Sequence, residues 1–294
     1  MKTALSASEE STVRYNIIDV GNVRIFYREA GAKTSPVLLL LHGFPTSSNM
    51  FRNVIGRLAR SFRVIAPDYP GYGFSSMPDH KSFSYNFENM AKIMAEFTEK
   101  LELSKYIVYL MDYGAPIGLR MALKNPDKIA GLIVQNGNAY EEGLRDFWIP
   151  MKKYWKDPSP ENFKGLFLSD PGAAKWQYTE GVPDTSLLDP STWTLDQAGL
   201  DRPGNPEIQL DMLYDYRTNL PLYPDFQAFF RKYQPPTLIV WGKNDTVFPT
   251  EGAIPYQRDL PNAEMHLIDT GHFALETHGQ EIASHIERFF SPRN

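Results

Sequence analysis

The chain alternates short, unbroken apolar runs with segments of helical periodicity, and this pattern restricts it to an α/β fold. Residues 37–41 are all aliphatic, as expected of a strand that is buried on both faces. Further strands are expected at 13–19, 23–29, 62–66, 106–111, 129–135, 236–241 and 263–268, and helices at 51–59, 85–101, 115–123 and 276–290. We therefore expect a mostly parallel sheet flanked by helices.

Residues 137–234 break this pattern, because no run among them is typical of a central strand. The segment holds ten prolines and four of the five tryptophans, between stretches of helical character. A structureless loop of this length is implausible in a compact domain. The sequence therefore predicts a helical cap (lid) inserted after the sixth strand, with residues 1–136 and 235–294 forming the core. In such sheets, ligands bind at the carboxyl edge.

Composition excludes several classes of function. The net charge of −5 and the pI near 5.7 give no basic surface for nucleic acid. The absence of cysteine excludes disulfides, thiolate metal sites and a cysteine nucleophile. Residues 1–14 are polar, and no apolar run approaches the length of a membrane span. We expect a cytoplasmic protein with no nucleic-acid and no membrane partner.

One tight turn stands out at the end of the predicted strand 106–111. The strand continues through Asp112-Tyr113-Gly114-Ala115 directly into a helix, and such a turn displays the side chain at its bend. Serine usually occupies that place within Gly-x-Ser-x-Gly, a motif absent from this chain. Asp112 is ionised near neutral pH and can therefore serve as a nucleophile, although an isolated Asp-x-Gly is also typical of a helix N-cap.

Two further chemical side chains follow later strands. Asp245 comes just after strand 236–241, and His272 just after strand 263–268. Taken alone, Asp245 could be a turn residue and His272 a core histidine. Together with Asp112 they give the order nucleophile, acid, histidine, each at the carboxyl end of a strand, which is the hydrolase arrangement.

The segment His42-Gly43-Phe44-Pro45 follows strand 37–41. The backbone N–H of Phe44 is positioned to pair with that of Tyr113 in an oxyanion hole. An ordinary β-turn is the alternative interpretation of this segment.

These motifs resemble those of α/β-hydrolases of the epoxide hydrolase and haloalkane dehalogenase branch, over essentially the whole chain. One departure is Leu110, because epoxide hydrolases usually carry glycine two residues before the nucleophile, whereas dehalogenases tolerate a branched residue there. The matching motifs are His42-Gly43-Phe44-Pro45, Asp68-Tyr69-Pro70-Gly71-Tyr72-Gly73-Phe74-Ser75, Asp112-Tyr113-Gly114, Gly242-Lys243-Asn244-Asp245 and Gly271-His272-Phe273.

The resemblance implies the α/β-hydrolase fold and a covalent mechanism. Asp112 would attack carbon to form an alkyl-enzyme ester, and His272, oriented by Asp245, would activate the water that cleaves it. The N–H groups of Phe44 and Tyr113 would hold the oxyanion. Water and a small molecule would be the substrates, with no cofactor and no metal ion. The substrate pocket is expected to include the side chains of His42, Trp155 and Phe273.

The leaving group decides which reaction this mechanism performs. Opening an epoxide expels an alkoxide that needs a proton, which the family supplies from two cap tyrosines. Tyr216, in Tyr216-Arg217-Thr218-Asn219, resembles one of them, and Tyr154 lies in the region that carries the other. Most tyrosines only fill a core or a surface, and Tyr214 and Tyr140 are the alternatives for these two assignments.

Expelling a halide needs no proton, only N–H donors in an apolar site. Haloalkane dehalogenases place tryptophan directly after the nucleophile and asparagine or glutamate after His-Gly, where this chain has Tyr113 and Phe44. Haloacetate dehalogenases share His-Gly-Phe-Pro and a cap tyrosine where Tyr216 lies, and Trp155 could match their halide-binding tryptophan. They bind the substrate carboxylate with arginines just after the nucleophile, where this chain has Tyr113, Ala115 and Pro116.

The sequence thus favours an epoxide hydrolase acting on a small apolar epoxide. A haloalkane or haloacetate dehalogenase is the alternative, and a non-catalytic ligand-binding protein with the hydrolase fold is a second one. A homodimer is left open.

Overall fold

The computed structural model describes residues 12–164, 166 and 172–290, so most of the polar segment 1–14 lies outside the described residues. The described strands form one eight-stranded sheet in the order β1-β2-β4-β3-β5-β6-β7-β8. β2 pairs antiparallel with β1 and β4, and the other pairs are parallel. The strands are β1 (Arg14–Val20), β2 (Val23–Ala30), β3 (Val37–Leu41), β4 (Arg63–Pro67), β5 (Tyr106–Met111), β6 (Ile129–Gln135), β7 (Thr237–Gly242) and β8 (Glu264–Ile268).

Helices flank this sheet, so the predicted α/β-hydrolase class with a mostly parallel sheet is confirmed. Predicted and observed elements agree to within a few residues; the last helix, for example, begins at Ala274 instead of residue 276. The helices are α1 (Arg52–Leu58), α2 (Phe87–Lys100), α3 (Gly114–Lys124), α4 (Trp148–Lys156), α5 (Pro160–Phe163), α6 (Ala173–Thr179), α7 (Ser191–Leu200), α8 (Asn205–Asp215), α9 (Tyr223–Tyr233), α10 (Tyr256–Asp259) and α11 (Ala274–Phe290).

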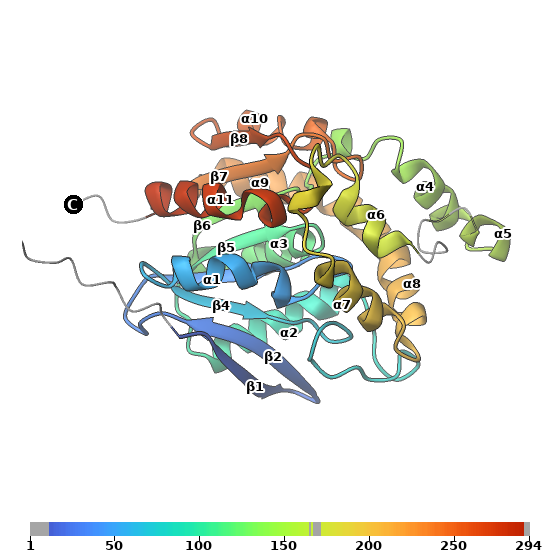
Figure 1. Cartoon of the computed structure of the whole chain (residues 1–294), viewed down its shortest axis with the longest axis horizontal. Helices are drawn as coiled ribbons and strands as arrows, with labels where there is room; N and C mark the ends of the chain where they lie inside the picture. Colours follow the sequence, from blue (N-terminus) through green and yellow to red (C-terminus); the bar gives the residue numbers. More distant parts are fainter. Residues whose placement is uncertain (1–11, 165, 167–171, 291–294) are drawn as a thin grey trace, which may run out of the picture.

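The sheet separates two apolar cores, as the two-residue period of a strand requires. In β3, Leu38 and Leu40 face the core that includes residues of α1 and α11. Leu39 and Leu41 face the opposite core, which includes residues of α2, α3 and α9. Figure 1 shows the sheet between these helices. Burial on both faces explains why the central strands are recognisable in the sequence as continuous aliphatic runs.

The cap segment, residues 137–234, lies between β6 and β7. Its described residues form helices α4 to α9 and short 3₁₀ turns, and none of them lies in a strand. Helices α4 to α8 gather beyond one end of the sheet, on the right in Figure 1. Among the described residues, every helix is too short or too polar to cross a bilayer.

Candidate active site

A sharp bend between β5 and α3 displays Asp112. Its φ of +49° lies in the left-handed region, which a non-glycine residue adopts only under local constraint. Glycines on both sides make the bend possible. A Cβ at Gly43 would lie 2.3 Å from Asp112 Cβ, and one at Gly114 would lie 2.4 Å from the Leu41 carbonyl oxygen. The sequence signal at Asp112 therefore reflects a backbone that must pass very close to its neighbours.

Two backbone N–H groups donate to the Asp112 carboxyl group. The Phe44 N–H lies 2.8 Å from Oδ1, and the Tyr113 N–H also bonds to this carboxyl. These are the two groups predicted to form an oxyanion hole, and the structure brings them together. Burial raises the pKa of Asp112, although the neighbouring His272 and both N–H groups act in the opposite direction. The site therefore holds a buried carboxyl group that is poorly solvated and strongly oriented.

Asp245 and His272 meet at the same edge of the sheet. His272 Nδ1 donates to Asp245 Oδ2 over 2.7 Å, which leaves Nε2 directed toward Asp112. Asp245 is itself held by the Asn136 amide, 2.8 Å from Oδ2, and by the Val247 N–H, 2.7 Å from Oδ1. These bonds fix the orientation of the imidazole.

His272 Nε2 lies 3.8 Å from Asp112 Oδ2 and has no hydrogen-bond partner. Burial alone would lower the pKa of His272, but the negative charges of Asp245 and Asp112 outweigh it and raise the pKa above 6.5. The structure thus brings all three members of the predicted triad together. Such an arrangement can combine a carboxylate nucleophile with an imidazole base.

An aromatic enclosure covers this pair. Tyr216 begins a 3₁₀ turn of the cap segment, Tyr216–Leu222, and is fully buried. Its ring lies 6.1 Å from that of Tyr113, and 6.4 Å from that of Phe248, which in turn lies 6.0 Å from the His272 ring. Trp148 packs at 4.4 Å and Trp155 stacks at 6.1 Å on the same tyrosine.

The Tyr216 hydroxyl is the polar group of this enclosure. It is buried and makes no hydrogen bond of normal geometry, although it lies close enough to the Tyr223 hydroxyl for the two to interact. Burial raises the pKa of Tyr216 well above its ordinary value, and the charge of Asp112 contributes in the same direction. The phenol is therefore protonated near neutral pH.

Arg120 of α3 anchors the turn that carries Tyr216. Its guanidinium donates to Asn219 Oδ1 over 2.6 Å and to the Thr218 hydroxyl over 3.2 Å. It also donates to the Pro116 carbonyl within its own helix. This buried arginine links the helix that follows Asp112 to the cap segment, and it fixes the height of Tyr216 above the site.

The structure does not bring every predicted residue into this cluster. Tyr154 packs edge-on against Tyr214. Burial raises the pKa of Tyr154, and the charges of Tyr214 and Asp211 contribute in the same direction. Tyr214 lies under the Arg217 guanidinium, at 3.6 Å. Tyr140 donates to Asp259. None of the described contacts of these three tyrosines reaches Asp112.

The three predicted pocket residues make their described contacts within the protein. His42 is fully buried, with Nδ1 bonded to the Gly43 carbonyl and Nε2 accepting the Tyr69 N–H; burial lowers its pKa to about 3. Trp155 donates its indole N–H to the Leu213 carbonyl over 2.9 Å. Phe273 stacks on Tyr178 behind His272. His42 thus supports the loop below the site.

Several neighbours of Asp112 and Asp245 are not identified by the motifs of the sequence. Asn136 has a φ of +45°, and the signal that could have identified it is the Asn-Gly pair directly after a buried strand. Tyr69 and Tyr72 lie in the quoted 68–75 motif, are fully buried, and have raised pKa values to which the Asp112 charge contributes. The contacts of Trp148 and Phe248 with Tyr216 could not be predicted, because the fold brings together residues of the cap segment and of the core loop after β7.

A cavity of ≈270 Å³ lies beside this cluster, between core loops and cap helices. Tyr72 lines it together with Gln209 of α8, to which the Tyr72 hydroxyl donates over 2.7 Å. Its lining does not include Asp112 or His272.

Comparison with known proteins relates the chain to a large group of enzymes. A family model described as the alpha/beta hydrolase fold matches residues 36–279. "Uncharacterized hydrolase YNR064C" of Saccharomyces cerevisiae is 47% identical over 95% of this chain and 97% of that protein. "Haloalkane dehalogenase 2" of Mycobacterium tuberculosis is 29% identical over 92% and 93%, respectively. The solved structure of the epoxide hydrolase CorEH superposes with a TM-score of 0.75 at 23% identity, over 95% of this chain and 99% of that one, a likeness of fold alone.

Proposed function

The chain belongs to the α/β-hydrolase fold family, and on this premise we propose that it hydrolyses a small apolar epoxide through an ester on Asp112. It is related to haloalkane dehalogenases in sequence and to epoxide hydrolases in fold. The observation that carries the choice of substrate is the buried Tyr216 phenol, which lies in the enclosure over the Asp112–His272 pair.

In the first step, Asp112 attacks an epoxide carbon. The Phe44 N–H already binds Oδ1, so Oδ2 is the oxygen left to attack. The carbon–oxygen bond of the epoxide breaks, and the resulting alkoxide takes the proton of Tyr216. The products of this step are a hydroxyalkyl ester on Asp112 and a tyrosinate.

In the second step, His272 Nε2 takes a proton from water, and the hydroxide adds to the ester carbonyl carbon. The oxyanion forms on Oδ1, where the N–H groups of Phe44 and Tyr113 stabilise it. Collapse releases the diol oxygen, which takes the proton from His272. The regenerated Asp112 carboxylic acid returns its proton to the tyrosinate, directly or through water, and both groups are restored.

The tryptophans of the enclosure argue against a halide as the leaving group. A halide ion is stabilised by N–H donors that have no other partner. Here the Trp148 indole N–H donates to the Val247 carbonyl over 2.8 Å, and the Trp155 N–H donates to Leu213. Using either for a halide would leave a buried carbonyl unsatisfied, at about 1–3 kcal/mol.

A haloacetate substrate meets a further obstacle. Its carboxylate would need a cationic partner inside the enclosure. Arg120 is buried nearby in α3. Its two terminal nitrogens donate to Pro116, Thr218 and Asn219, and its Nε lies 3.6 Å from a Glu88 carboxylate oxygen. Tyr113 and Pro116 stand where the haloacetate enzymes carry arginine. Dehalogenation is therefore the weaker candidate.

The test compares three substrate classes and then follows an isotope. Purified protein is incubated with 1,2-epoxybutane, 1-bromobutane and fluoroacetate, and diol and free halide are quantified. Release of diol as the main activity supports the proposal, and turnover of none of the three would favour the non-catalytic alternative. In a single turnover in H₂¹⁸O, label is expected on the Asp112 peptide and not in the diol. Label in the diol alone would show direct attack by water and refute the ester.

A further inference from the structure

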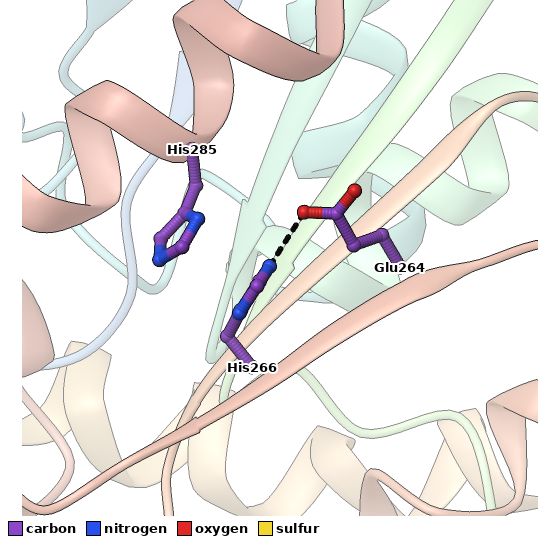
Figure 2. Close-up of side chains that lie close together, drawn as sticks. All are labelled: Glu264, His266 and His285. Carbon is purple, nitrogen blue, oxygen red and sulfur yellow. Dashed lines mark hydrogen bonds and ion pairs between the residues drawn. The ribbon is translucent and has the colours of Figure 1, made fainter.

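A second cluster of chemical side chains lies far along the chain from Asp112, at the edge of the sheet. Glu264 and His266 lie two residues apart on the edge strand β8, so their side chains share one face. His285 faces them from α11, as Figure 2 shows. One ligand atom from each of the three residues lies within 4.8 Å of the other two. His266 Nε2 is 2.6 Å from Glu264 Oε1, and the two imidazole rings stack at 3.7 Å.

A positively charged nitrogen already lies against this cluster. Arg288 Nη2 bonds to Glu264 Oε1 and lies 3.0 Å from His285 Nδ1 and 3.4 Å from His266 Nε2. Three potential ligand atoms therefore converge on one cationic group. The Arg288 side chain is 58% exposed, so it can rotate into solvent without leaving a buried charge behind.

The surroundings of His285 match a ligating histidine. Its Nε2 lies 3.6 Å from Glu281 Oε1, one helical turn earlier in α11, which leaves Nδ1 on the side of Glu264 and His266. A carboxylate on the outer nitrogen of a metal-bound histidine fixes the ring and increases the basicity of the inner nitrogen.

We propose that Glu264, His266 and His285 form a site for a divalent transition-metal ion such as Zn²⁺, which displaces the Arg288 guanidinium. Two imidazole nitrogens and one carboxylate oxygen suit Zn²⁺, Co²⁺ or Ni²⁺, whereas Mg²⁺ and Ca²⁺ prefer oxygen ligands alone. Such an ion binds its ligands at about 2.0–2.2 Å, so the three side chains would have to turn toward a common point. Water would complete the coordination.

The ion would join the edge strand to the last helix. The site involves the first residues of β8, whereas His272 follows the carboxyl end of that strand. Metal binding is therefore expected to stabilise the fold without taking part in the proposed hydrolysis. This site is separate from the candidate active site, for which the sequence analysis predicts no metal.

The test is a titration of the full chain, freed of metal with a chelator, with ZnCl₂ by calorimetry and with CoCl₂ by visible absorption. One ion per chain and a rise in Tm with Zn²⁺ are expected. His285→Gln and Glu264→Gln should each weaken binding at least tenfold and abolish the rise in Tm. Arg288→Gln should strengthen binding several-fold, because it removes the competing cation. His80→Gln is the matched control, a histidine beside a carboxylate (Asp211, 3.1 Å) elsewhere on the surface, and should change nothing.

Each contrary result overturns the proposal. The absence of saturable binding by the parent chain would show that the arginine-filled cluster is only an ionic contact. Equal affinity in the parent and in folded His285→Gln and Glu264→Gln chains would place the ion elsewhere. Unchanged or weaker binding by Arg288→Gln would contradict displacement of the guanidinium. Circular dichroism of each variant without metal establishes that it is folded.

Discussion

Replacing Tyr216 with phenylalanine separates the proposed chemistry from packing. The ring is fully buried, so the substitution keeps the aromatic packing and removes only the hydroxyl and its contact with the Tyr223 hydroxyl. We expect a loss of stability below about 1 kcal/mol. A positioned proton donor contributes about 10²–10⁴-fold in rate, or about 3–5 kcal/mol of barrier. Hydrolysis of an epoxide should fall by that factor.

The matched substrate is a bromoalkane with the same number of carbons. Its leaving bromide needs no proton, so any turnover of 1-bromobutane should fall by no more than about tenfold in Tyr216→Phe, the value of one hydrogen bond. The assay is kcat/KM for diol release from 1,2-epoxybutane and for bromide release from 1-bromobutane. Tyr154→Phe is the control, because Tyr154 packs on Tyr214 outside the enclosure, and should change both by less than about threefold. Equal losses on the two substrates, or a Tyr154→Phe loss as large as that of Tyr216→Phe, would refute the role of Tyr216 as proton donor.

Three further predictions concern the base, its pKa and the elbow. His272→Gln should trap the ester, visible by mass spectrometry as an increment on the Asp112 peptide; a fully active variant would refute the base. NMR titration of the resting protein should give a His272 pKa above 6.5. The rate of ester hydrolysis should fall as the pH is lowered, with an apparent pKa below the one measured by NMR. An apparent pKa for ester hydrolysis above the NMR value would contradict the electrostatics of the site. Gly118→Ala should destabilise by about 1–3 kcal/mol in urea titrations, because its Cβ would lie 2.3 Å from Leu110 Cδ2. Gly56→Ala, with open space around it, should not.

The sheet and the positions of the triad residues were predictable because they depend on local patterns. Each central strand is an aliphatic run, and parallel strands end at a common edge, so Asp112, Asp245 and His272 had to lie near one another once the strands were assigned. Leu110 shows the limit of such reasoning. It departs from the glycine usual in epoxide hydrolases, and the structure accommodates it through Gly118, whose missing Cβ makes room for the leucine.

The cap segment was predictable as helical, but its contacts were not. In the sequence, Tyr216 matches a family motif and Tyr154 only lies in the region of the second donor. Their different surroundings become visible only in the packing of the cap segment. Tyr216 is held over the site through the bonds of Arg120 to Asn219, which lie 99 residues apart in the chain. The partner of the Trp155 N–H is a backbone carbonyl in another helix. Contacts of this kind leave no periodic signal, because they depend on how helices are placed relative to one another.

The proposed ester also changes the electrostatics of the base that must cleave it. In the resting site, the negative charges of Asp245 and Asp112 both favour protonated His272, and burial opposes them. Alkylation makes Asp112 neutral, so one of the two stabilising charges disappears while the burial remains. The pKa of His272 must then fall, and a larger fraction of the imidazole becomes neutral at the stage at which a neutral base is required. Asp245 does not react, and the Asn136 amide and the Val247 N–H hold its carboxyl group in place beside His272. Protonated His272 thus lowers the pKa of the buried Asp112 carboxyl in the first step, and loss of the Asp112 charge favours an unprotonated His272 in the second.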